Sequence, residues 1–294
     1  MAITRNAYFD QKVYIGVTGS TPTELHGVQS FDGSWEVPLT PIKAAGFGVI
    51  SVEAEGEMQG SVNVSRLVTH SAELDPIINY NYYLGVGLLD KPVTGFLSYG
   101  TNESFDKAFY FNQGRITSYS SSCSVGSLPT SDFSVQIYGD IGSGDYFGAD
   151  TTPTTLIAKP GDITLSVPDS TTNALQSYNL NLNLDWQPLY GIGSAMKPVG
   201  YRLNYPIEVS VDFNMIVDSY ESRDFYNLLC SPQIDNLELT LRNCEEPISK
   251  FRIENARLKS NSFSSSIGDN LTVDISYVAY IKNSGELANL FPTV

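Results

Sequence analysis

The sequence is poor in basic residues. Lysine and arginine together number 17 among 294 residues, against 32 aspartates and glutamates, so the formal net charge is −15. A protein that holds DNA through its phosphates needs clustered basic side chains to release counterions, so this composition excludes a DNA-gripping role. The acidity belongs to the whole chain, because residues 1–147 contain 7 basic and 15 acidic residues and the remainder contains 10 and 17.

Long apolar runs and paired cysteines are also missing. No run approaches the roughly 18 apolar residues of a membrane-spanning helix, and the start of the sequence lacks the pattern of a signal peptide. We therefore expect synthesis in the cytoplasm and no membrane partner. Cys123, Cys230 and Cys244 are odd in number and widely spaced, which predicts small apolar packing residues and no disulfide framework or zinc site.

Residues with catalytic potential are few and lack partners. His26 and His70 are the only histidines, and no G-x-S-x-G motif accompanies them. Ser194 and Lys197 match the S-x-x-K motif of penicillin-binding enzymes, but they lie between a glycine and a proline and have no partner K-T-G. The sequence therefore predicts no enzyme activity, no catalytic residue and no cofactor.

A glycine-rich stretch with three aspartates is the one candidate for a metal site. Asp140, Asp145 and Asp150 are spaced by five residues, whereas a calcium loop has ligands at alternate positions and a closing glutamate. A solvated linker is the better interpretation, and no metal is predicted.

Alternation of apolar and polar residues dominates the rest of the chain. A period of two is typical of half-buried antiparallel strands, so we predict an all-β protein. Helical periodicity is limited to two short stretches, Asp75–Tyr82 and Glu221–Cys230. The clearest alternating segments are Ile50–Glu57, Ser61–Ser65, Phe133–Tyr138, Ile207–Phe213, Leu237–Leu241 and Leu271–Tyr277.

An internal repeat runs through the sequence in the same order in both halves. The two tryptophans, Trp35 and Trp186, follow similar Gln-Ser-aromatic triplets and lie 151 positions apart (186 − 35). Val62 and Val211 begin similar segments at a spacing of 149. Later anchors are Arg115 with Arg257 and Gly126 with Gly268, both at 142, and Val135 with Val273 at 138.

The steady fall in spacing indicates a duplicated domain whose second copy has shorter loops. The alternative is a chance likeness between serine-rich strands of similar composition. Duplication predicts two tandem β-sandwich or β-barrel domains of similar fold, each with one short flanking helix. Their expected bounds are residues 1–139 and 173–294, joined by a linker with a connecting strand at residues 140–172.

Two stretches resemble a known family. Gly27–Trp35, and Ala256–Leu258 followed by a polar strand and Ile267–Val273, are similar to the tail tube (major tail) proteins of long-tailed bacteriophages. With the duplication, the resemblance spans most of the chain and leaves 140–172 unmatched. It implies a β-sandwich or β-barrel with a flanking helix, self-assembled into rings that stack as a hollow tube for DNA.

The duplication has a consequence for stoichiometry. The usual family member has one tube domain and six copies in each ring, so a chain with two domains is expected to close a ring with three copies. The resemblance further implies a location in the virion tail and contacts with the tape measure, terminator and tail tip or baseplate proteins. A sheath would be a further partner in a contractile tail. DNA would pass without specific binding.

Acidic residues on strands are candidates for the wall of such a channel. Alternation places Glu53, Glu55 and Glu57 on one face of a strand, and Glu208 and Asp212 on one face of another. At least one set is expected to line the lumen, where negative charge would leave the passing polyanion mobile. The alternative is that these acids decorate the outer surface.

A binding module is the rival function. The 34 aromatic residues could supply stacking platforms in a tandem β-sandwich adhesin or carbohydrate-binding protein. Most of them alternate with polar residues in strands, which favours core packing. The state of assembly distinguishes the two functions.

Overall fold

The computed structural model describes thirteen stretches of the chain, and all structural statements below refer to them. They are residues 11–37, 39–44, 48–54, 59–70, 88–99, 107–144, 156–167, 170–172, 175–192, 198–216, 234–244, 246–264 and 272–292. The described residues are mostly antiparallel β-structure, as the alternation predicted. The two short helices expected at 75–82 and 221–230 lie outside these residues.

Strands β1 to β11 come from the first half of the chain. They are β1 (Gln11–Val17), β2 (Thr23–Glu24), β3 (Val28–Glu36), β4 (Leu39–Ala44), β5 (Gly48–Ala54), β6 (Gln59–Leu67), β7 (Thr69–His70), β8 (Val93–Tyr99), β9 (Lys107–Ser124), β10 (Thr130–Ile137) and β11 (Ile141–Gly144). A single 3₁₀ turn, η2 (Leu88–Asp90), precedes β8.

The remaining strands, and the short helix found among the described residues, follow. They are β12 (Leu156–Ile157), β13 (Ile163–Val167), β14 (Ser170–Thr172), β15 (Leu175–Asn183), β16 (Trp186–Leu189), β17 (Gly200–Leu203), β18 (Ile207–Ile216), β19 (Ile234–Asn243), β20 (Glu246–Ser264), β21 (Thr272–Ile281) and α2 (Ser284–Asn289).

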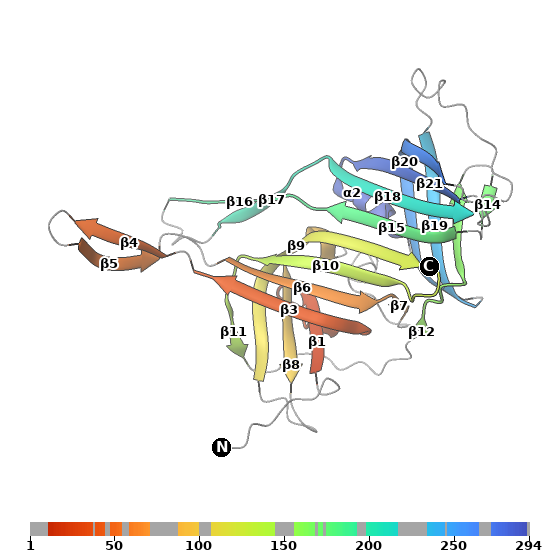
Figure 1. Ribbon diagram of the computed structural model, residues 1–294. Coiled ribbons are helices and arrows are strands. Elements are labelled where there is room, and N and C mark those ends of the chain that lie inside the picture. The colour runs from red at the N-terminus through yellow and green to blue at the C-terminus, as the bar shows by residue number, and fades with distance from the viewer. Residues whose placement is uncertain are drawn as a thin grey trace.

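Fifteen strands form one large antiparallel sheet that runs through both halves of the chain. Its main path is β14-β13-β19-β20-β21-β18-β15-β9-β10-β6-β3, with β8, β1, β2 and β11 attached through β9. Figure 1 shows β3, β6, β10, β9, β15 and β18 side by side across the molecule. Two hairpins, β4–β5 and β16–β17, pair only within themselves.

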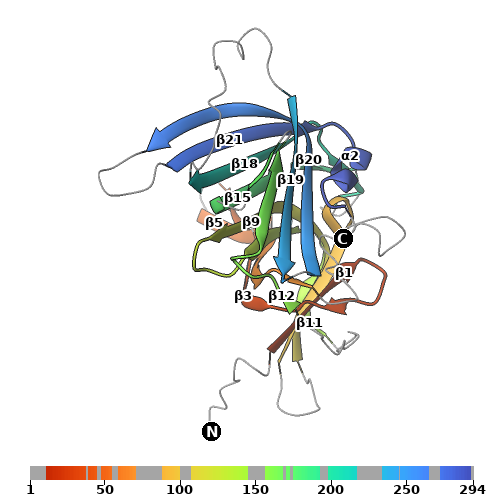
Figure 2. The ribbon, with the colours of Figure 1, turned by 90° about the vertical axis from the view of Figure 1, so that its right-hand side faces the viewer.

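Two unusually long strands fold the sheet into layers. In β9, residues 107–114 pair with β8, while residues 114–122 pair with β10. In β20, residues 246–257 pair with β19, while residues 257–264 pair with β21. Each strand thus passes from one layer to the next, so the apolar faces of the layers enclose a core (Figure 2).

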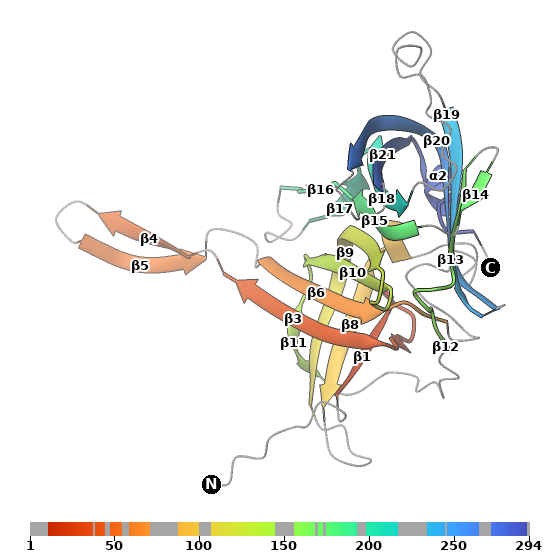
Figure 3. The ribbon, with the colours of Figure 1, turned by 45° about the vertical axis from the view of Figure 1, so that its right-hand side comes forward.

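The order of pairing is the same in the two halves. Strands of the first half follow the order β2-β1-β8-β9-β10-β6-β3, and those of the second follow β14-β13-β19-β20-β21-β18-β15. The connecting strand expected in the stretch 140–172 is β13, and together with β14 it belongs to the large sheet through its pairing with β19. In the view of Figure 3 the second set lies above the first.

The registers of the two halves also agree. Gln29 in β3 and Gln176 in β15 are each an extra residue at a bulge against the neighbouring strand. Thr117 in β9 and Lys259 in β20 are likewise bulged, and they lie 142 positions apart (259 − 117). Bulges bend a strand at one chosen point. Their coincidence means that both halves of the sheet bend at matching positions.

Backbone conformation adds an independent match in the same strands. Gln113 and Asn255 both have positive φ, of 50° and 56°, and they too lie 142 positions apart (255 − 113). Few residues other than glycine adopt this conformation, so it rarely recurs at a fixed spacing by accident.

The registers do not align the two tryptophans with each other. Pairing places Trp35 at the position of Leu182, and it places Trp186 at the position of Leu39 in the hairpin β4–β5. The hairpins themselves match, since Leu39 pairs with Ala54 as Trp186 pairs with Leu203. The spacing of 151 expected from the sequence is corrected to 147 in this region.

Candidate functional site

One face of the large sheet carries mostly polar and acidic side chains, although Leu67, Ile216 and Val278 lie on the same side toward the strand ends. We call it the polar face, and pairing in register brings its residues from eight strands onto one side. It comprises Ser30, Asp32, Ser34 and Glu36 of β3; Gln59, Ser61, Asn63 and Ser65 of β6; Thr130, Asp132, Ser134 and Gln136 of β10; Ser118, Ser120, Ser122 and Ser124 of β9; Ser177, Asn179, Asn181 and Asn183 of β15; Glu208, Ser210, Asp212 and Asn214 of β18; Thr272, Asp274 and Ser276 of β21; and Ser260, Ser262 and Ser264 of β20.

The opposite side of the same strands explains this segregation. Val62, Phe133, Leu180, Val211 and Ile275 alternate with polar-face residues and are buried in the core. Burying one face of an amphipathic sheet leaves the other for water, so the period of two in the sequence determines which residues are exposed.

Hydrogen bonds between neighbouring strands order the polar face. The Ser134 hydroxyl donates to Oδ1 of Asn63 at 2.7 Å, and the Asn214 amide donates to Oδ1 of Asp274 at 2.6 Å. Hydroxyl groups of Ser34 and Ser61 are 2.9 Å apart. These contacts use short side chains, so the surface is even and few long side chains project from it.

Acidic groups are the only charges among the polar-face residues. They are spread over four strands and comprise Asp32, Glu36, Asp132, Glu208, Asp212 and Asp274. Arginines lie at one margin, where Arg115 pairs with Gln136 and Arg257 pairs with Val278, and the bulged Lys259 precedes Ser260. The middle of the face is therefore a polar surface of negative charge.

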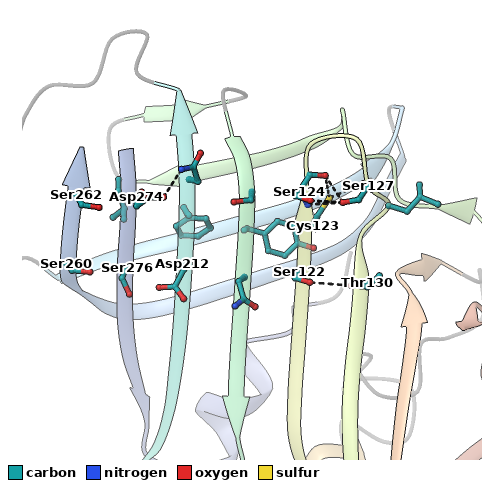
Figure 4. Close-up of a pocket in the computed structure, with 17 residues that line it drawn as sticks. Ser122, Cys123, Ser124, Ser127, Thr130, Asp212, Ser260, Ser262, Asp274 and Ser276 are labelled. Atoms are coloured by element: carbon teal, nitrogen blue, oxygen red, sulfur yellow. Dashed lines mark hydrogen bonds between the residues drawn. The ribbon is translucent and has the colours of Figure 1, made fainter. Parts of the chain in front are cut away.

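A shallow groove of about 800 Å³ lies where the two halves of the polar face meet. Figure 4 shows Ser122 and Ser124 on one side of this groove and Asp212, Asp274 and Ser262 on the other. Its walls contain hydroxyls, amides and carboxylates, with no histidine and no basic side chain. The arrangement offers hydration and negative charge, and it offers no nucleophile with a base beside it.

Corresponding positions in the two halves have similar chemistry. Ser118 matches Ser260 and Ser120 matches Ser262, and Asp132 matches Asp274, all at the spacing of 142 fixed by the registers. Pairing between β15 and β9, from Ser177 opposite Ser124 to Asn183 opposite Ser118, makes the face continuous across the junction.

The acidic candidates from the sequence fall in two different places. Glu208 and Asp212 are exposed and share the polar face, as alternation predicted. Glu53 lies in β5, in the hairpin that projects from the body of the molecule (Figures 1 and 3), and it pairs with Thr40. Glu55 and Glu57 lie outside the described residues.

The residues that defined the repeat in the sequence have different surroundings. Arg115 lies between two rings of the hairpin β16–β17, with its guanidinium carbon 4.9 Å from the Trp186 ring centre and 4.4 Å from that of Tyr201. The Trp186 indole donates to the carbonyl of Ile116 at 2.8 Å. Burial beneath the hairpin lowers the pKa of Arg115. Arg257, its counterpart, is exposed.

Trp35 and the two glycines complete this set. Trp35 is 59% exposed and stacks on Phe109 with ring centres 5.8 Å apart. Gly126 has a φ of +83° in the turn after β9, as expected for a glycine in a tight turn. Gly268 lies outside the described residues.

The other candidates from the sequence are dispersed. His26 lies beside Glu24, with Nδ1 and Oε1 3.9 Å apart, and Asp140 accepts from the amide of Asn112. His70 belongs to β7, while Ser194, Lys197, Asp145 and Asp150 lie outside the described residues. Within the described stretches, no three histidine, cysteine or acidic side chains come together as metal ligands.

The cysteines differ in their exposure. Cys123 is buried, as expected of a packing residue, whereas Cys244 is exposed with its Sγ 3.0 Å from Nζ of Lys159. Cys230 lies outside the described residues. Among the helices in the described residues, none has the length and hydrophobicity needed to cross a membrane.

Sequence reasoning missed most of the polar face. Serine at every second position, in Ser118–Ser124 and again in Ser260–Ser264, was the available signal, because such a row must lie on one side of a strand. Comparison with known proteins adds no assignment: no protein-family model matches the chain, and no match was found among curated proteins.

Proposed function

We propose that this protein is a structural protein of the bacteriophage tail, a tail tube protein made of two tandem copies of one β domain. The observation that carries the proposal is the pairing of β15 with β9, in which an edge of the second half extends the sheet of the first. The matching strand orders, bulges and positive φ angles support the duplication. On this basis the second copy begins at β13.

The same junction can be repeated between molecules. Among the described residues, β3 pairs only with β6, and residues 259–264 of β20 pair only with β21. By register, β3 corresponds to β15 and β20 corresponds to β9. The open edge of β3 is therefore the counterpart of β15 at the internal junction, and the open edge of β20 is the counterpart of β9. Open edges of this kind invite pairing with another chain.

The internal junction also fixes the expected register of the external one. Asn181 lies opposite Ser120, so Ser34 should lie opposite Ser262 of the next protomer. Asn179 opposite Ser122 likewise predicts Asp32 opposite Ser264. Such head-to-tail contacts close into a ring when the rotation between domains divides a full turn. We infer three protomers and six domains in each ring.

The chemistry of the polar face supports a position on the wall of the lumen. A wall of hydroxyls, amides and carboxylates presents no cation to a phosphate backbone, so DNA would slide along it without being held. Contacts with tape measure, terminator and tail tip proteins follow from the same proposal. A tandem adhesin would instead need an exposed recognition site. The two aromatic residues that line the groove, Tyr178 and Phe213, are each only 2% exposed, so they offer no stacking platform to a ligand in solvent.

Cross-linking tests the ring junction directly. In a background of Cys230→Ser and Cys244→Ser, the pair Ser34→Cys and Ser262→Cys should form a disulfide between protomers, seen as a ladder of oligomers in a non-reducing gel. The matched control is Ser120→Cys with Asn181→Cys, which should close within one chain. Electron micrographs of the same protein should show rings or tubes. A protein that stays monomeric at every concentration and forms only the internal disulfide would contradict the proposal.

A further inference from the structure

The hairpin β16–β17 occupies a defined site on the first half of the molecule. Trp186 and Tyr201 enclose Arg115, and the Tyr201 ring lies 5.0 Å from the ring of Tyr138. Arg115 and Tyr138 come from β9 and the end of β10. This contact holds the hairpin of one half against the sheet of the other, next to the β15–β9 junction.

A second copy of the same site is open. The register spacing of 142 places Arg257 at the position of Arg115 and Tyr280 at that of Tyr138 (280 − 138). Both are exposed, Tyr280 at 50% of its surface, and no described aromatic ring lies over Arg257. An arginine and a tyrosine at matching positions are thus half-buried beside a hairpin in one half and exposed in the other.

The chain also contains a second hairpin, β4–β5, which corresponds to β16–β17 but is not docked. The hairpin β4–β5 is inserted between β3 and β6 as β16–β17 is inserted between β15 and β18, with matching registers. It projects away from the body (Figures 1 and 3), and Leu39, at the position of Trp186, is 61% exposed. It does not lie on the site of its own chain.

We propose that the hairpin β4–β5 of one protomer docks on Arg257 and Tyr280 of its neighbour, as β16–β17 docks on Arg115 and Tyr138 within the chain. The inference rests on the proposed function, because it requires ring assembly. It adds a second contact between protomers to the strand junction. Leu39 supplies an aliphatic side chain where Trp186 supplies a ring. It would therefore pack along the alkyl stem of Arg257 and leave the guanidinium near Tyr280.

Substitution in the open site measures its contribution to assembly. Arg257→Ala and Tyr280→Ala should each raise the protein concentration needed for ring formation by about tenfold or more, since arginine and tyrosine are typical interface hot spots. Sedimentation over a dilution series gives that concentration. Arg252→Ala is the matched control, because Arg252 is also exposed on β20 but forms an ion pair with Glu254 at 3.2 Å. It should leave assembly unchanged.

Cross-linking identifies the occupant. With Cys230 and Cys244 replaced by serine, Leu39→Cys and Arg257→Cys should be joined between protomers by a short bismaleimide, and the internal control pair is Trp186→Cys with Arg115→Cys. Two results together would overturn this inference: no link between positions 39 and 257, and no effect of Arg257→Ala on assembly. If rings still form and cross-link through Ser34→Cys and Ser262→Cys, the tube proposal remains intact. Absence of any ring and of both intermolecular links would overturn the tube proposal as well.

Discussion

Single residues show where the chain uses special backbone geometry. Gly126 has a φ of +83° and no heavy atom within 4 Å of the place where a Cβ would stand. A substitution there meets no steric neighbour, so its cost comes from the backbone conformation alone. The neighbouring bond from the Ser127 amide to the Ser124 carbonyl, at 3.0 Å, closes the turn.

Gly126→Ala should lower the free energy of unfolding by about 1 kcal/mol or more, because alanine is strained at positive φ. Gly142→Ala is the control, since its Cβ would also meet open space but its φ is not positive. Urea unfolding of both variants measures the difference. Equal stability of the two would show that the turn relaxes without cost.

His26 provides a second test at the residue scale. Burial lowers its pKa below the ordinary 6.5, and the nearby Glu24 opposes this shift only in part. Because the pKa of His26 is lower in the folded protein than in the unfolded chain, the unfolded chain binds the proton more readily at a pH between these two values. The free energy of unfolding therefore falls as the pH drops below about 6.5. His26→Gln should therefore flatten the dependence of the melting temperature on pH between about pH 5 and pH 7. An unchanged slope would assign that dependence to other groups.

At the scale of elements, alternation predicted strands well and their partners poorly. It correctly placed Glu208 and Asp212 together on an exposed face, because a period of two is a local property of one strand. It could not tell that Glu53 belongs to a separate hairpin, since pairing depends on residues far away in the sequence. The same limit applies to residues 163–172, whose role in the large sheet depends on β19.

The proposed repeat was likewise visible in the sequence only in part. Serine rows and the Arg115–Arg257 match are sequence signals, and the registers agree with their spacing. Strands β8 and β19 share pairing order but little residue identity, so only the backbone reveals their correspondence. The tryptophans misled the alignment because a rare residue attracts a match even when it occurs at different positions.

The helix α2 illustrates how a small element can hold both halves. Asn283 caps it by accepting from the amide of Glu286 at 3.0 Å, and Glu286 in turn accepts from the amide of Lys282. Phe291 follows the helix and is 2% exposed. Its ring contacts Tyr119 of β9 and Phe251 of β20, with ring centres 5.6 and 5.8 Å away.

Phe291→Ala should therefore destabilise the protein by about 3–5 kcal/mol, the usual cost of emptying a buried aromatic site. Phe291→Leu retains most of the volume and should cost less than half as much. Urea unfolding followed by fluorescence and circular dichroism measures both. A loss below about 1 kcal/mol for the alanine variant would mean that the two halves do not depend on this contact.

At the scale of the whole molecule, shape and charge act together in the proposed function. The sheet is continuous through the chain and open at β3 and β20, while its polar face presents only hydroxyls, amides and carboxylates between its margins. Continuation of the sheet from one protomer to the next would carry the same face around a complete ring. In such a ring, part of the net charge of −15 would lie on the surface that the proposal turns toward DNA.

Reversing that charge tests the mechanism. Asp132→Lys, Asp212→Lys and Asp274→Lys combined should leave rings and tubes intact, because these side chains are not in the core, but should make the wall retain DNA and impair genome delivery. Retention should weaken steeply with added salt, since it depends on counterion release. The comparison variant is Glu53→Lys, Glu55→Lys and Glu57→Lys, which makes the same charge change in β5 and the three residues that follow it in the sequence. Because β4–β5 is the proposed docking hairpin, assembly of this variant is checked first by sedimentation, and the tubes that form should permit delivery. DNA binding by isolated tubes at several salt concentrations and infectivity of the particles are the two measurements. Full infectivity of the polar-face variant would contradict the electrostatic role of this face, whereas impaired delivery by the hairpin variant alone would move the lumen to β4–β5.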